Sequence, residues 1–129
     1  MIKNLKMSVE TEIIIDLSYL REVASGNTEF MIEMIDIFLA QTPGYIDQLT
    51  VAIGQKDWTK MAELSHKIKP TMSFMGVESA KETLGEIEIK SRKQVDYDWI
   101  TEEYDKLEEV FKIMLLKLVE KKKELLAEG

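Results

Sequence analysis

The strongest constraint on the fold is the spacing of apolar residues, which advances by three and four positions in segment after segment. In the last third of the chain this spacing puts seven side chains on one helical face: Ile100, Tyr104, Leu107, Phe111, Met114, Leu118 and Leu125. Such a pattern is typical of amphipathic helices that pack in bundles. It breaks at Lys121, and the charged residues 120–124 are expected to overhang the bundle.

Capping residues and glycines mark the first helices. Asp16 precedes a short helix that is expected to end at Gly26, where glycine favours a left-handed turn. Asn27 or Thr28 then caps a longer helical pattern, which Pro43 interrupts. One kinked helix and two abutting helices both fit this pattern.

Two further helices follow before the last one. Asp57 caps a helix that Gly76 ends, and the next helix begins just after that glycine. Gly85 lies inside this second helix, which indicates a close helix crossing. Residues 91–97 are polar and are expected to form a loop, after which Asp98 caps the last helix.

These segments predict an all-α fold, an antiparallel four-helix bundle (up-down-up-down) preceded by a short N-terminal helix. Residues 1–15 are expected to form an extended lead-in, and residues 16–129 a single bundle domain. Apolar residues make up 45% of the chain, which is enough for one core.

The charge of the chain narrows the range of partners. The formal net charge is −7 and the pI is about 4.8, so no basic surface is available for nucleic acid or an anionic membrane. The absence of cysteine excludes disulfides and thiolate chemistry. No apolar run reaches the length of a signal peptide or a membrane span, so we expect a cytoplasmic protein.

The only histidine, His66, lies in the helix between Asp57 and Gly76. On a helical wheel the apolar residues of this helix span roughly 80°: Met61, Leu64, Ile68, Met72 and Met75. His66 lies about 160° from the middle of that arc, so its ring is expected to face solvent. The same outward face carries Ala62, Lys69, Pro70 and Ser73.

An exposed neutral imidazole is a nucleophile that can accept a phosphoryl group on a ring nitrogen. Lys69, one turn on from His66, can supply a cation for the phosphoryl oxygens, and small neighbours leave room for a partner's active site. The sequence contains no Gly-rich nucleotide loop and no hydrolase triad around the histidine. The phosphoryl donor is therefore expected to be another protein.

The motif His66-Lys67-Ile68-Lys69, followed by Gly76, resembles the signature of histidine-containing phosphotransfer (HPt) domains, the carriers of multistep phosphorelays. The likeness extends over about residues 16–119, including Asp57-Trp58. It implies that His66 takes a phosphoryl group from the aspartate of one response-regulator receiver domain and passes it to the aspartate of another.

The resemblance also implies roles for other groups. Lys69 would assist the transfer, and Gly76 would join Ala62, Pro70 and Ser73 as small residues that face the partner. Mg²⁺ would come from the receiver, so no metal or cofactor is expected in this chain. The protein would be a carrier with little activity alone, served by receivers, by a hybrid sensor kinase, or by both.

Pro70 departs from the family pattern, in which this position is usually glycine. Proline lacks the N–H that would bond the carbonyl of His66, so a bent but continuous helix is expected. The alternative is a break at Lys69, which would put the role of that lysine in doubt.

Two other functions stay open at this point. Glu63 and His66 form a Glu-x-x-His pair, which di-metal carboxylate bundles use for their ligands, but only one copy is present. A helical adaptor without chemistry is the other alternative, because the long C-terminal seam could serve binding alone.

Overall fold

The computed structural model describes residues 13–128, and within this range the chain forms five helices joined by short turns. The helices are α2 (Ser18–Val23), α3 (Thr28–Gly54), α4 (Trp58–Phe74), α5 (Glu78–Lys93) and α6 (Tyr97–Glu128). Most of the lead-in predicted for residues 1–15 lies outside the described residues.

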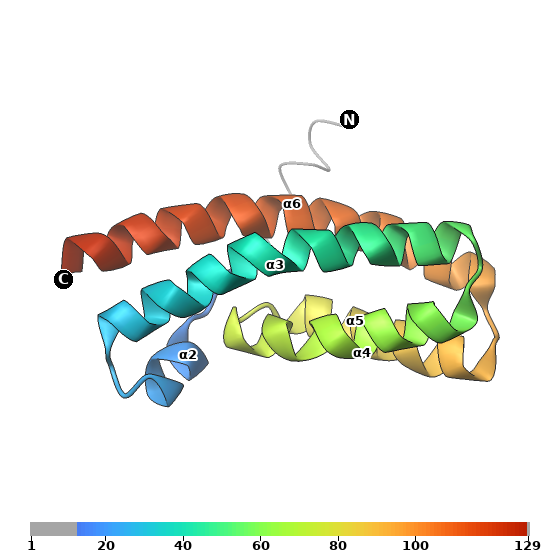
Figure 1. Cartoon of the computed structure of the whole chain (residues 1–129), viewed down its shortest axis with the longest axis horizontal. Helices are drawn as coiled ribbons and strands as arrows, with labels where there is room; N and C mark the ends of the chain where they lie inside the picture. Colours follow the sequence, from blue (N-terminus) through green and yellow to red (C-terminus); the bar gives the residue numbers. More distant parts are fainter. Residues whose placement is uncertain (1–12, 129) are drawn as a thin grey trace.

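The four long helices run alternately up and down, with α2 beneath one end of α3 (Figure 1). Each helix from α3 to α5 packs against its successor, and α6 packs against both α5 and α3, which closes the bundle. The predicted all-α antiparallel four-helix bundle with a short helix in front is confirmed. Within the described residues, no helix is both long enough and apolar enough to cross a membrane.

Short polar side chains begin the helices where the sequence predicts them. The Asn27 side chain accepts a hydrogen bond from the backbone N–H of Phe30 at 3.0 Å, and Asp57 accepts one from Lys60 at 3.3 Å. Each carboxylate or amide oxygen satisfies an N–H that has no partner within its helix. Between these caps α3 is one helix that runs through Pro43, so the alternative of two abutting helices is wrong.

The loop predicted for residues 91–97 is wrong over its first half. Helix α5 continues to Lys93, because Ser91 is buried against the core and carries the helical register on. The helix ends at Gln94, whose φ of 55° is left-handed. Since α6 already begins at Tyr97, Asp98 lies in its first turn and does not cap it.

Two helices of the bundle are much longer than the other two. Helices α3 and α6 have 27 and 32 residues, whereas α4 and α5 have 17 and 16. At about 1.5 Å per residue, the helices of the long pair are roughly 15 to 25 Å longer than those of the short pair. Helix α2 fills part of the space that this difference leaves on one side of the long pair (Figure 1).

The charged end of α6 does not overhang the bundle, contrary to the prediction. Leu125 is only 3% exposed and belongs to the core cluster. Lys122 forms an ion pair with Asp36 of α3 at 2.6 Å, and Glu128 pairs with Arg21 of α2 at 3.5 Å. The end is covered because the N-terminal half of α3 and helix α2 lie beside it, which the spacing of α6 alone does not reveal.

Gly76 ends α4 in a conformation that only glycine adopts without strain. Its φ is +70°, and a Cβ at this position would lie 1.7 Å from the carbonyl oxygen of Asp16. The Asp16 N–H donates a hydrogen bond to the Gly76 carbonyl at 3.3 Å. The segment before α2 is therefore attached directly to the end of α4.

We expect Gly76→Ala to lower the free energy of unfolding by at least about 2 kcal/mol, because both the left-handed φ and the Asp16 backbone oppose a side chain. Gly44→Ala is the matched control: this glycine lies inside α3 with nothing within 4 Å of a new Cβ. It should raise stability by up to about 1 kcal/mol. Urea denaturation measures both, and equal effects of the two variants would contradict this account of Gly76.

Candidate functional site

His66 lies midway along α4 and points away from the core. Its side chain is 64% exposed, while Met61, Ile68 and Met72 on the opposite face are fully buried. Helix α4 runs without interruption from Trp58 to Phe74 with Pro70 inside it. The predicted continuity is confirmed, and the alternative of a break at Lys69 is wrong.

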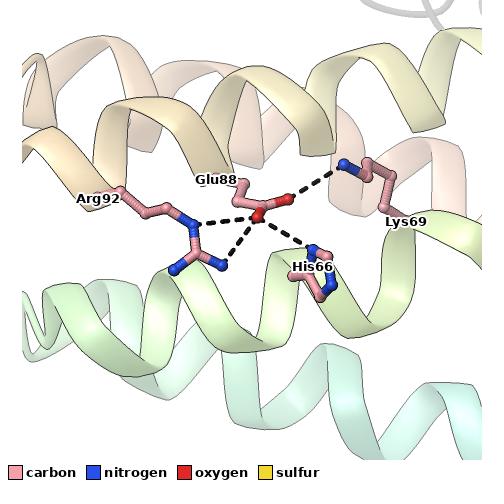
Figure 2. A network of polar contacts seen from close by, with 4 residues as sticks. All are labelled: His66, Lys69, Glu88 and Arg92. Atoms are coloured by element: carbon pink, nitrogen blue, oxygen red, sulfur yellow. Dashed lines mark hydrogen bonds and ion pairs between the residues drawn. The ribbon is translucent and has the colours of Figure 1, made fainter.

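A single buried carboxylate, that of Glu88 on α5, organises the polar groups around the histidine (Figure 2). Its Oε2 lies 3.0 Å from Nδ1 of His66, and its Oε1 accepts a hydrogen bond from Nζ of Lys69 at 3.1 Å. Arg92, one turn further along α5, donates to Oε2 from Nε at 3.1 Å and from Nη2 at 2.8 Å. Glu88 is only 8% exposed, so protein groups provide most of its surroundings.

The surroundings of Glu88 keep it ionised. Burial acts to raise the pKa of this carboxyl group, but hydrogen bonds from Arg92, Lys69 and His66 outweigh burial, and the pKa is lowered from its ordinary value of 4.5. At neutral pH the side chain is therefore a carboxylate that can only accept hydrogen bonds.

The ionised carboxylate fixes which nitrogen of His66 carries the proton. Because Glu88 has no proton to give, the bond at 3.0 Å requires Nδ1 of His66 to be the donor. In a neutral ring the lone pair is then at Nε2, the nitrogen that points away from Glu88 in Figure 2. The site thus presents a nucleophilic nitrogen on an exposed ring.

Lys69 extends along the surface of α5. A Cβ at Gly85 would lie 3.7 Å from Cδ of Lys69, so the glycine leaves space beside the lysine stem. The predicted close approach at Gly85 is thereby explained, and the ammonium group ends on Glu88. The Lys69 side chain is 32% exposed, so part of it is in contact with water.

The prediction that Ala62 faces the partner is wrong, because this residue is 3% exposed. Ser65, on the same side of α4, has no exposed surface at all. Ala62 lies beside Ser91 and Arg92 of α5. Among the described residues, α4 and α5 pack against each other more extensively than any other two helices. Small side chains here allow α5 to approach closely, so the buried face of α4 is wider than its apolar stripe.

The other small residues have different surroundings. Pro70 is exposed and Ser73 is partly exposed, so both remain available to a partner. Gly76 is also partly exposed, but the side of it that a Cβ would occupy lies against Asp16. Its main role is in the fold.

Sequence reasoning missed Glu88 and Arg92. Glu88 lies four residues after Leu84 and three before Ser91, in the register of the buried face of α5, where a carboxylate needs partners. Arg92 follows at the i+4 position that suits an ion pair. The helical register therefore indicates a buried Glu88 with Arg92 as its partner. Assigning residues 91–97 to a loop hid this pair, because it placed Arg92 outside the helix.

The Glu-x-x-His interpretation assigned Glu63 as the companion of His66. In the structure, the carboxylate that contacts His66 is that of Glu88, on another helix. Among residues 13–128, no group of three or more His, Asp or Glu side chains is arranged to hold a metal ion.

Comparisons with known proteins identify a matching family and a matching fold. The family model described as Hpt domain matches residues 33–120. The chain is also similar to a solved structure, the HPt domain from an Hpt sensor hybrid histidine kinase of Shewanella, with a TM-score of 0.69 and 20% identity. That similarity covers 94% of this chain and 97% of the other and concerns the fold. No curated protein gives a significant match.

The lowered pKa of Glu88 predicts how stability depends on pH. A carboxyl group whose pKa is lower in the folded state than in the unfolded state stabilises the folded protein. Its contribution is complete at pH values above the unfolded-state pKa and is lost as the pH falls through the folded-state pKa. We expect Glu88→Gln to cost about 1–3 kcal/mol near neutral pH. The difference in the free energy of unfolding between this variant and wild type should become smaller at pH values below the ordinary carboxyl pKa of about 4.5.

Urea denaturation at several pH values measures this difference. The control is Glu82→Gln, an exposed glutamate of the same helix, which should change stability by less than about 0.5 kcal/mol. A difference between wild type and Glu88→Gln that stays constant down to pH of about 3 would contradict the role given to the carboxylate.

Proposed function

We propose that His66 carries the phosphoryl group in this chain, which belongs to the Hpt domain family because the Hpt domain model matches more than half of its length. Histidine phosphotransfer in a phosphorelay is the role of this family, and of this chain. The observation that supports His66 is its position: the only imidazole of the chain is 64% exposed, with Nδ1 held by Glu88.

The transfer that we propose needs no base from this chain. The lone pair of Nε2 attacks the phosphorus of an aspartyl phosphate on a receiver domain. An N–P bond forms, the P–O bond to the receiver breaks, and the aspartate leaves with that electron pair as a carboxylate. Nδ1 keeps its proton throughout, so the ring of His66 becomes cationic and Glu88 faces the new positive charge.

Transfer onward is the reverse of this step with a second receiver. The carboxylate of its aspartate attacks the phosphorus, the N–P bond breaks, and the electron pair returns to Nε2. Glu88 stabilises the cationic ring in both directions, so it does not by itself set the direction of flow. We expect Mg²⁺ and the remaining catalytic groups to belong to the receiver, which makes this protein a carrier with little activity alone.

We propose that Lys69 stabilises the phosphoryl group. It lies one turn from His66 on the same helix, and its side chain is 32% exposed. Its ammonium group donates to Glu88, and we propose that it turns from that carboxylate to the phosphoryl oxygens during the transfer. Neutralising the equatorial oxygens is one of the main requirements of phosphoryl transfer.

An apolar surface near the C-terminal end of α4 is suited to docking a receiver. The ring of Phe74 packs against Tyr19 of α2 in a tilted arrangement with ring centroids 5.3 Å apart, and Tyr19 is 49% exposed. Ile37 of α3, 48% exposed, lines a shallow pocket together with Phe74. Exposed Pro70 lies between Phe74 and His66 along α4, so this surface borders the site. We propose that receivers approach across it.

Labelling from a phosphorylated receiver tests the function. Wild type should acquire label that is labile in acid and stable in alkali, as a phosphoramidate is. His66→Gln keeps the size of the side chain but should acquire none, while its urea midpoint stays close to that of wild type because the ring is exposed. A receiver without its phosphorylatable aspartate is the control. Label on His66→Gln at the wild-type level would refute the assignment of His66, whereas absence of label on the wild-type protein would favour the adaptor alternative.

A further inference from the structure

We propose that Arg92 is a positioning residue that holds Glu88 in place while Lys69 moves from this carboxylate to the phosphoryl group of His66. The inference rests on the proposed function, since it concerns the same transfer. Arg92 makes its hydrogen bonds to Glu88 and, in our proposal, does not bind the phosphoryl group.

The first step of the argument is how the donors divide between the two oxygens of Glu88. Lys69 alone donates to Oε1, whereas Arg92 and His66 both use Oε2 (Figure 2). Departure of Lys69 therefore breaks one bond and leaves the other three intact. In particular, the contact that orients the His66 ring does not depend on the lysine.

The second step is the cost of leaving a buried carboxylate without a cation. Glu88 is 8% exposed, so water compensates little for a lost partner. From α4 the carboxylate faces His66 and Lys69, and from its own helix it faces Arg92. Without Arg92, Lys69 would be the only permanent cation at Glu88, and the carboxylate would compete directly with the phosphoryl group for it.

The third step is the geometry of Arg92 itself. Two of its nitrogens, Nε and Nη2, donate to the same oxygen at 3.1 and 2.8 Å. Its side chain is 55% exposed, but the carboxylate end of the pair is buried, which reduces screening by solvent. The guanidinium therefore balances the Glu88 charge before and after the transfer, and Lys69 can move to the phosphoryl group without leaving the carboxylate unpaired.

A double-mutant cycle between Arg92→Gln and Lys69→Ala tests this role. The measurement is the single-turnover rate at which each protein takes a phosphoryl group from a phosphorylated receiver. Arg92→Gln should slow uptake about tenfold in the wild-type background, the equivalent of one charge-assisted hydrogen bond. It should have little effect when Lys69 is already alanine, because no lysine is left to release.

Arg92→Lys distinguishes an effect of the lost positive charge from an effect of disturbed folding. It keeps a cation four residues from Glu88 and should recover most of the rate lost in Arg92→Gln, and urea midpoints of all variants verify folding. Equal slowing by Arg92→Gln in both backgrounds, no slowing in either, or an Arg92→Lys variant as slow as Arg92→Gln would each overturn the inference. Absence of label on wild-type protein would instead refute the proposed function, and the inference with it.

Discussion

The buried ion pairs of Glu88 couple the two helices that form the site. A carboxylate at 8% exposure is unfavourable unless charged partners surround it, and here α4 supplies two donors while the next turn of α5 supplies the third. The same contacts that make burial of Glu88 tolerable also orient the ring of His66. Stability therefore depends on these contacts, and in our proposal the transfer at His66 depends on them as well.

Close packing of α4 and α5 makes this arrangement possible. Ala62 and Ser65 on α4 and Gly85 and Ser91 on α5 are small, so the two backbones can approach each other. Among the described residues, the hydroxyl groups of Ser65 and Ser91 are buried and have no hydrogen-bond partner within the protein. The close approach of the two helices allows a glutamate on one to reach a histidine on the other.

The sequence predicts those parts of the structure that depend on local chemistry. Asn27 and Asp57 cap their helices, and the apolar stripe of α4 turns His66 outward, because both effects are contained within one helix. The prediction that Ala62 faces the partner failed because a helical wheel describes one helix without the helices that pack against it. The width of a buried face depends on how closely α5 approaches, and that is a property of the pair.

Arg92 was missed for a related reason. Residues 91–97 are polar, and polarity alone favours a loop, but the burial of Ser91 extends the helix to Lys93. The covering of the far end of α6 likewise depends on the length of α3, beyond what either segment indicates. The outward position of His66 and the nearness of Lys69 follow from one helix, whereas their shared contact with Glu88 depends on how α5 packs against α4.

The central claim is that Glu88 keeps the proton of His66 on Nδ1 and leaves Nε2 free to accept the phosphoryl group. Because the chain has one histidine, ¹⁵N NMR of the imidazole reports on this ring without assignment. At a pH where the ring is neutral, the account predicts a protonated Nδ1 and an unprotonated Nε2, and phosphorus coupling to Nε2 after phosphorylation. A ring protonated mainly at Nε2, or a phosphoryl group bonded to Nδ1, would contradict it.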